Sequence, residues 1–74
     1  GKKNICGDRV HEARRRVRLT QRDLAAKLQI EGVIIERDSV SRIEIGTRFV
    51  ADYELRALSS ILKVSVAWLL GIED

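Results

Sequence analysis

Residues 37–45 combine side chains that hydrogen-bond readily with very little apolar surface for a helix. In helical spacing only Val40 and Ile43 face inward, and the polar positions around them are Arg37, Asp38, Ser39, Ser41 and Arg42. Such a helix gains little from burial, since each buried CH₂ contributes about 0.8 kcal/mol, and it needs bracing by its neighbours. The major groove of B-DNA admits one α-helix and offers hydrogen-bond patterns that arginine, serine and aspartate can read. We therefore expect this helix to be presented to a partner, with double-stranded DNA as the leading candidate.

Positive charge is concentrated at the beginning of the sequence. The net charge is +3, but residues 1–20 hold seven Lys or Arg residues against Asp8 and Glu12, whereas residues 51–74 hold two against four acidic residues. A basic front and a mildly acidic tail suit a one-sided surface for a polyanion. Solvated helix residues without a partner are the alternative that charge alone leaves open.

Arg14 and Glu44 are predicted to form a structural ion pair. Arg14, Arg15 and Arg16 are adjacent in sequence, but successive helical residues point about 100° apart, so they do not share one face. Arg14 lies at the edge of the apolar stripe, and an unpaired buried guanidinium would cost several kcal/mol. Glu44 follows the inward-facing Ile43 and is the expected carboxylate partner, while Arg15 and Arg16 are expected to be solvated.

Five helices are predicted to position these residues, over residues 5–18, 20–30, 37–45, 52–62 and 65–70. The first follows from an apolar stripe at steps of four, three and four: Cys6, Val10, Ala13 and Val17. Thr20 is a typical N-cap for the second helix, with the Asp23 carboxylate in its first turn. Asp52 and Ser65 are the predicted caps of the fourth and fifth helices. No strand pattern competes, so we expect an all-α fold.

The link between the second and third helices contains a β-branched run, Val33, Ile34 and Ile35. The run is too short for a helix and too isolated for a sheet. We expect an ordered, partly buried connector, followed by the third helix, which ends at Gly46.

The sequence contains too few residues of the types that form catalytic or metal sites. Cys6 and His11 are the only cysteine and the only histidine, so neither a disulfide within the chain nor a zinc site is expected. No Ser–His–Asp pattern and no Gly-rich phosphate loop is present. We expect one non-enzymatic domain over residues 1–74, without metal, cofactor or small-molecule substrate. Within it, Cys6 is expected to pack as a small hydrophobe and His11 to be solvated. Trp68 is expected to contact either the core or a second copy of the chain.

No run of 18 apolar residues and no charged leader segment is present. Neither a membrane span nor export is therefore expected, and the predicted location is cytoplasmic.

Three segments resemble the Cro and phage-repressor type helix-turn-helix family, also called XRE-like. They are LTQRDLA at residues 19–25, SVSRIEIG at residues 39–46 and VSVAWLLG at residues 64–71. The resemblance extends over roughly residues 6–71. It implies a five-helix, lambda-repressor-like domain that binds double-stranded DNA sequence-specifically, usually as a homodimer, and controls transcription, for example as a repressor.

The resemblance also implies roles for single residues. Gln21 and Arg22 begin the second helix, whose amino terminus would point at a phosphate, and Gln21 can brace a base-reading side chain. The outward positions of the recognition helix match Arg37, Asp38, Ser39, Ser41 and Arg42, and the phosphate-contacting loop after it matches Thr47 and Arg48. The family also has an ion pair at the positions of Arg14 and Glu44.

Two features depart from the family pattern. The segment from Leu28 to Glu36 makes the turn about five residues longer, and Ile45 stands where a polar residue is more usual.

A second hypothesis comes from a different functional class. An antitoxin-like or adaptor domain would use the same fold as a protein-interaction module, without reading bases. Its partner surface would then be the acidic tail and the apolar run at residues 33–35.

Overall fold

The computed structural model describes all 74 residues and contains five helices and no strand. The helices are α1 (Gly7–Arg16), α2 (Gln21–Ile30), α3 (Arg37–Ile45), α4 (Asp52–Leu62) and α5 (Val66–Leu69). The predicted all-α fold with five helices is confirmed. α1 and α5 are shorter than the ranges 5–18 and 65–70 expected for them. None of the five has both the length and the apolar character that crossing a bilayer requires.

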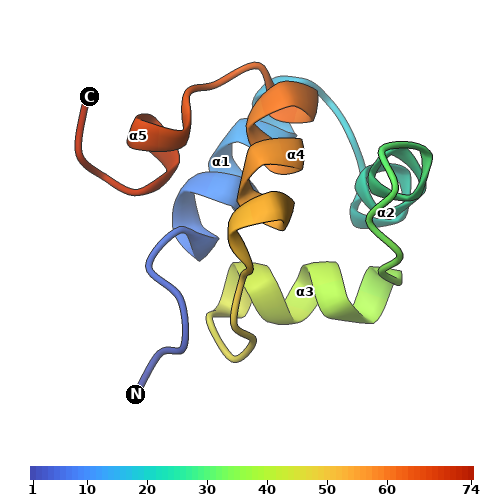
Figure 1. Cartoon of the computed structure of the whole chain (residues 1–74), viewed down its shortest axis with the longest axis horizontal. Coiled ribbons are helices and arrows are strands. Elements are labelled where there is room, and N and C mark those ends of the chain that lie inside the picture. The colour runs from blue at the N-terminus through green and yellow to red at the C-terminus, as the bar shows by residue number, and fades with distance from the viewer.

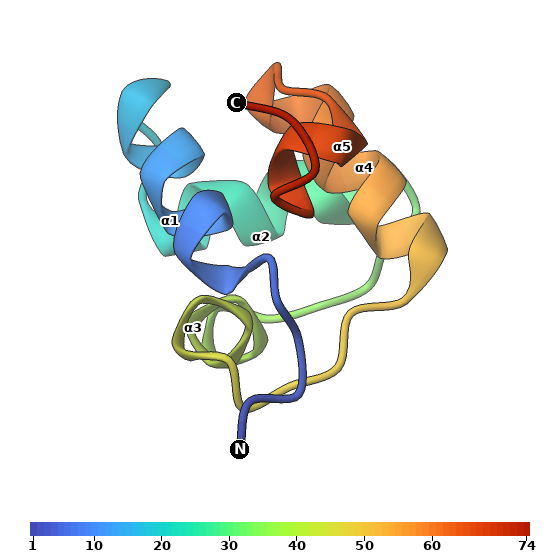
Figure 2. The same ribbon diagram turned by 90° about the vertical axis from the view of Figure 1, so that its left-hand side faces the viewer.

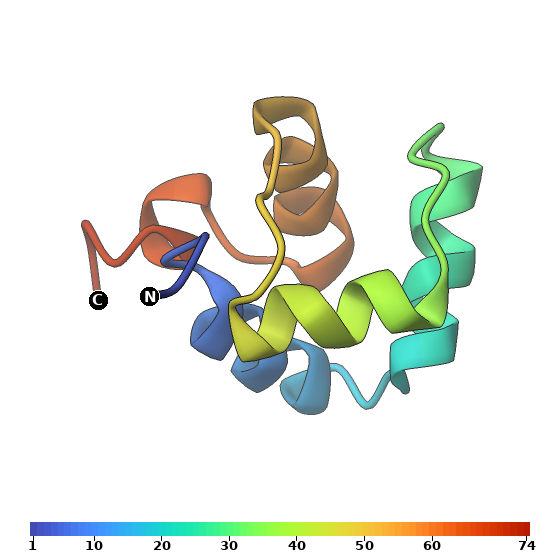
Figure 3. The same ribbon diagram turned by 90° about the horizontal axis from the view of Figure 1, so that it is seen from below.

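α3 lies across one side of the molecule, with α1 and α4 on its inner flank and α2 near its amino-terminal end (Figure 1). A view turned by 90° shows α3 end-on, below α1 (Figure 2). Seen from below, α3 lies in front of the other helices (Figure 3). One flank of α3 therefore packs on the core, and the opposite flank faces solvent.

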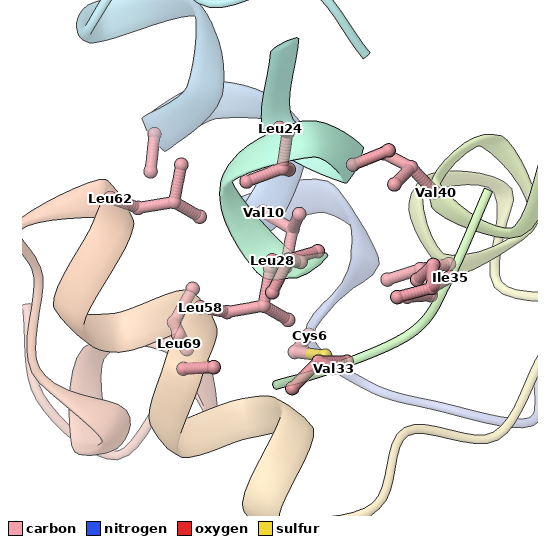
Figure 4. Packing of buried hydrophobic residues seen from close by; sticks show 14 residues of the cluster. Cys6, Val10, Leu24, Leu28, Val33, Ile35, Val40, Leu58, Leu62 and Leu69 are labelled. Carbon is pink, nitrogen blue, oxygen red and sulfur yellow. The ribbon is translucent and has the colours of Figure 1, made fainter. Parts of the chain in front are cut away.

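Fourteen buried apolar residues form one core, to which all five helices contribute (Figure 4). Leu24 and Leu28 of α2 and Leu58 of α4 all belong to this core, and each residue is at most 1% exposed. Val33 and Ile35 of the connector are 5% and 4% exposed, whereas Ile34 between them is 82% exposed. This alternation is typical of extended backbone, and it makes the connector the ordered, partly buried segment that was expected.

The connector's part in the core can be tested with a matched pair of substitutions. We expect Ile35→Val to lower the free energy of unfolding by about 0.5–1.5 kcal/mol, because it removes a methyl group from a packed site. Ile34→Val makes the same chemical change at an exposed position and should stay within about 0.5 kcal/mol of wild type. Urea unfolding followed by circular dichroism measures both. Equal effects would show that the connector is not part of the core.

α2 begins with a capping box. The hydroxyl of Thr20 accepts from the backbone N–H of Asp23 at 3.0 Å, and the Asp23 carboxylate accepts from the backbone N–H of Thr20 at 3.0 Å. These hydrogen bonds hold the pKa of Asp23 below its usual range, with a further contribution from the nearby charges of Lys27 and Arg22. The predicted start of α2 therefore has its cap in place.

The cap of α4 differs from the prediction. Ala51 occupies the N-cap position, and Asp52 is the first helical residue. The carboxylate of Glu54 accepts from the backbone N–H of Ala51 at 2.9 Å, which satisfies one of the amides that a helix start leaves unpaired. Glu54, rather than Asp52, thus supplies the side chain that caps the amino-terminal end of α4. Ser65 caps α5 as expected and accepts from the N–H of Trp68 at 2.9 Å.

α5 is held against α1 by Trp68. The guanidinium of Arg9 lies 4.7 Å from the centre of the indole ring, and that of Arg16 lies 5.2 Å from it. Arg9 also donates to the carbonyl oxygens of Trp68 and Glu73, both at 3.0 Å. Arg16 is exposed, as expected of a solvated residue, with its side chain 60% exposed, and it also pairs with the exposed Glu12. Trp68 is half-buried and packs against the core from within its own chain.

Candidate nucleic-acid interface

Glu44 is the point at which α1, α2 and α3 are joined. Its side chain is 5% exposed. Its Oε2 atom accepts from Arg14 Nε at 2.7 Å, and its Oε1 atom accepts from Arg14 Nη2 at 3.0 Å. Gln21 Nε2 donates to the same Oε1 at 3.1 Å. The carboxylate therefore binds α1 and α2 to the inner flank of α3, and the structure brings Arg14 and Glu44 into a bidentate pair.

His11 also belongs to this cluster. Its Nδ1 atom lies 2.8 Å from Glu44 Oε1, and the residue is half-buried. The expectation of a solvated histidine is wrong, since Glu44 reaches across from α3 to a position outside the apolar stripe of α1. Sequence spacing within one helix carries no signal for such a contact between two helices.

Opposing effects act on the Glu44 carboxyl. Burial raises its pKa, whereas the hydrogen bonds from Arg14, His11 and Gln21 and the charge of Arg14 lower it, and the net result is a pKa below the usual range. Glu54 behaves similarly. The hydrogen bond from Arg48 lowers the pKa of Glu54, burial opposes it, and the net pKa is again lowered.

Acid is therefore expected to weaken the fold through these two carboxyl groups. A carboxyl whose pKa is lower in the folded state stabilises the protein fully above its unfolded pKa, which is about 4.3 for glutamate. That stability is lost as the pH falls through the lowered folded value. We expect the free energy of unfolding, measured by urea titration from pH 6 to pH 3, to decline below about pH 4.3, and to decline less steeply in Glu44→Gln. Equal declines in the two proteins would contradict the role given to Glu44.

Gln21 links this cluster to the exposed end of α3. While its Nε2 atom donates to Glu44, its Oε1 atom accepts from Arg37 Nη1 at 3.4 Å. Arg37 also donates through Nη2 to Asp38 at 3.0 Å. Arg37 and Asp38 are both exposed. Gln21 is thus placed to brace Arg37, which is one of the two roles that the sequence suggested for it.

The solvent flank of α3 carries the other predicted residues. Arg42 is exposed and, unlike Arg37, its guanidinium meets no partner within the chain. Ser39 and Ser41 are half-buried, and Ile45 is 61% exposed. Val40 and Ile43 point inward and are each 1% exposed. The narrow apolar face expected of this helix is present, and the polar residues of its outer flank are exposed to solvent.

A basic depression of about 630 Å³ lies between the end of α1 and the start of α2. Its lining includes five arginines, namely Arg14, Arg15, Arg18, Arg22 and Arg37, together with Thr20 and Gln21. The free amides at a helix amino terminus attract anions, and the arginines add to this attraction. The structure therefore places the predicted Gln21 and Arg22 beside Arg14, the partner of Glu44, and beside Arg15 and Arg18, which the sequence did not assign to a site.

The loop after α3 holds Thr47 and Arg48. Thr47 is exposed. Arg48 is half-buried and donates through Nη1 and Nη2 to the two carboxylate oxygens of Glu54, each at 3.0 Å. Glu54 is 6% exposed, and sequence reasoning did not single it out. Arg48 was predicted only as a phosphate contact, but in the structure it also ties the loop to the start of α4.

No three His, Cys, Asp or Glu side chains lie close enough together to hold a metal ion. The chemistry available at this surface consists of guanidinium, hydroxyl, amide and carboxylate groups that form hydrogen bonds. It suits binding to an anionic partner that presents a pattern of donors and acceptors.

Comparisons with known proteins support the fold. No family model matches the chain, and no curated protein matches it. A solved structure that is similar is that of the P22 c2 repressor protein, determined in complex with the synthetic operator 9T in the presence of Tl⁺. The TM-score is 0.79 at 21% sequence identity, and the match covers 95% of this chain and 98% of that one. The fold is thus that of a repressor-type helix-turn-helix domain. Its helix-turn-helix element consists of α2, a long connector and α3.

Proposed function

We propose that this protein binds double-stranded DNA sequence-specifically and regulates transcription, with α3 in the major groove. The observation that carries the proposal is the division of α3, whose inner flank is fixed to α1 and α2 through Glu44 while Arg37, Asp38 and Arg42 face solvent. The fold supports it, because the similar P22 c2 repressor was solved in complex with an operator. The guanidinium, hydroxyl, amide and carboxylate groups of this surface suit a role in binding rather than in catalysis.

The two arginines of α3 have different roles in this proposal. Arg42 is free to make a bidentate contact with a guanine, the commonest specific contact in the major groove. Arg37 is held by Gln21 and Asp38, so less side-chain freedom is lost when it meets a base. Asp38 orients Arg37 in this arrangement, and Ser39 and Ser41 contribute hydroxyl groups along the same flank.

Phosphate contacts flank the recognition helix on both sides. At one side are Gln21, Arg22 and the amides that begin α2. At the other side are Thr47 and the exposed edge of Arg48. Contacts of this kind set the register on the duplex without reading its sequence. If two copies bind together, their half-sites should lie about 34–36 Å apart, one turn of DNA.

The alternative is a protein-interaction module, whose partner surface would combine the acidic tail with the connector. The connector contributes little to such a surface, because Val33 and Ile35 are buried in the core and only Ile34 is exposed, whereas Glu73 and Asp74 of the tail are exposed. The burial of the connector supports DNA over a protein partner for this part of the surface.

Selection from a pool of random duplexes at low salt tests the proposal. We expect a defined sequence motif to be enriched over successive rounds. Recovery of unselective sequences by the folded protein would argue against base reading by α3.

Arg42→Ala is expected to relax base preference at one position of each half-site. The loss of one bidentate pair corresponds to about 1–3 kcal/mol of discrimination between the right base and a wrong one. Competition binding with the selected duplex and its single-base variants measures this. Arg56→Ala is the matched control, because Arg56 is an exposed arginine of α4 beside Gly32. Equal effects of the two substitutions would contradict a base contact by Arg42.

A further inference from the structure

We infer that His11 is a positioning residue for the base-reading end of α3, and that its protonation releases Gln21 from Glu44. The inference rests on the proposed DNA binding and concerns the only histidine of the chain, to which that proposal gives no role. A histidine side chain gains and loses its charge near neutral pH. The consequence is a base discrimination that changes with pH in this range.

One oxygen of Glu44 is surrounded by three donors. Its Oε1 atom lies 2.8 Å from His11 Nδ1, 3.0 Å from Arg14 Nη2 and 3.1 Å from Gln21 Nε2. The other oxygen, Oε2, accepts from Arg14 Nε at 2.7 Å. A carboxylate offers about four lone-pair sites, about two on each oxygen. The three groups at Oε1 therefore compete for the available positions.

Protonation of the ring changes the outcome of this competition. A neutral imidazole carries one N–H, and the 2.8 Å contact with a carboxylate oxygen places that hydrogen on Nδ1 of His11. The side chain is 45% exposed, so a second proton can reach the ring from water. Arg14 and His11 then both present charged donors to Glu44, whereas Gln21 presents a neutral amide. Because opposite charges add coulombic attraction to the hydrogen bond, the amide is the donor that is displaced.

The charged groups in contact with the ring come from two helices. Glu44 of α3 favours the protonated ring, and Arg14 of α1, whose Nη2 atom lies 3.2 Å from Nδ1, opposes it. The group that α2 contributes, the amide of Gln21, does not titrate. The other charged residues within one turn on α1 are exposed and form no hydrogen bond or ion pair with the ring, namely Asp8, Glu12 and Arg15. Glu44 and Arg14 therefore act most directly on the charge of His11.

Gln21 transmits the change to the base-reading end of α3. While Glu44 holds its Nε2 atom, its Oε1 atom accepts from Arg37 Nη1 at 3.4 Å. Once Nε2 is released, the amide of Gln21 can rotate and Arg37 loses its link to α2. Arg37 then keeps only Asp38, at 3.0 Å on its own helix. Arg42 has no such link, so its base contact should not respond to the protonation.

The free protein tests the release of Gln21 without DNA. The ring signals of His11 and the side-chain amide signal of Gln21 are followed by NMR from about pH 8 to about pH 5.5. In this range Glu44 and Glu54 keep their charges, since their pKa values are lowered. We expect the Gln21 signal to move with the same midpoint as the ring. In His11→Asn, which supplies an amide N–H that does not titrate, the Gln21 signal should stay in place.

Base discrimination tests the effect on DNA reading. The measured quantity is the ratio of affinities for the selected duplex and for its variant at the base pair whose preference Arg37→Ala abolishes. We expect this ratio in wild type to fall about 2- to 12-fold between about pH 8 and about pH 5.5, which corresponds to the loss of one hydrogen bond. The same ratio at the base pair read by Arg42 is the internal control and should not change. In His11→Asn both ratios should be independent of pH. A ratio is used because added positive charge strengthens binding to every duplex alike.

The outcomes separate this inference from the proposed function. A Gln21 signal that stays in place while the wild-type ring titrates would overturn the inference, and so would a ring that takes up no proton in this range. Equal changes of discrimination in wild type and His11→Asn would also overturn it and leave the proposed function standing. Failure of wild type to select any motif would overturn the proposed function, whereas the Gln21 signal would still show whether His11 controls Gln21.

Discussion

Replacing Glu44 with alanine is expected to lower the free energy of unfolding by about 3–5 kcal/mol, because it leaves the charge of Arg14 inside the protein without a partner. The side chain of Arg14 is only 11% exposed, and its Nε and Nη2 atoms both donate to Glu44. Gln21 and His11 lose a partner at the same time. Since small proteins are stable by about 5–15 kcal/mol in total, this is a large part of the stability of the fold.

Urea unfolding followed by circular dichroism measures this effect. The control is Glu12→Ala, which removes an exposed glutamate that pairs with Arg16 on α1 and should cost no more than about 0.5 kcal/mol. If Glu44→Ala proves unfolded, the double variant Arg14→Met with Glu44→Leu should recover folding, because an apolar pair of similar volume replaces both charges. A loss below 1 kcal/mol for Glu44→Ala would contradict the bracing of α3 through this carboxylate.

Replacing Gly7 with alanine is expected to cost about 3 kcal/mol, at the upper end of what overpacking costs. A Cβ at Gly7 would meet the carbonyl oxygen of Ile43 in direct overlap and would lie 2.9 Å from that of Glu44. Both atoms belong to the backbone of α3, so they can move only if the whole helix moves away from α1. The higher helix propensity of alanine, worth up to about 1 kcal/mol, does not offset this.

Gly32→Ala provides the contrast for that measurement. Gly32 has φ +87° and nothing within 4 Å of an added Cβ, so its substitution is strained only by the backbone conformation. That strain is about 1–2 kcal/mol. Thermal or urea unfolding of both variants should rank Gly7→Ala as the more damaging. An unchanged or raised stability in Gly7→Ala would show that α1 and α3 are not in close backbone contact.

Much of the fold could be predicted because its signals are local. The apolar stripe of α1 and the cap at Thr20 each depend on residues within a few positions of one another. The buried pair of Arg14 and Glu44 could be anticipated because a charge at the edge of an apolar stripe needs a partner.

Several contacts that the sequence did not predict join residues on different elements or outside a periodic pattern. Asn4 precedes the first helix and binds carbonyl groups about forty positions away. Glu54 has the appearance of an ordinary acidic residue in the first turn of a helix, and only the course of the loop brings Arg48 to it. His11 lies off the apolar stripe and is reached from α3. Such contacts depend on how helices cross, which helical spacing within one element does not specify.

The most direct test of the central claim is a titration of the ¹⁵N-labelled protein with the duplex recovered by selection, followed by amide chemical shifts. We expect the largest shifts at residues 21–22, 37–42 and 47–48, with little change in α5. Shifts confined to α4 and α5, with the amides of α3 unmoved, would contradict the account, because α3 would then not be the helix that meets the DNA.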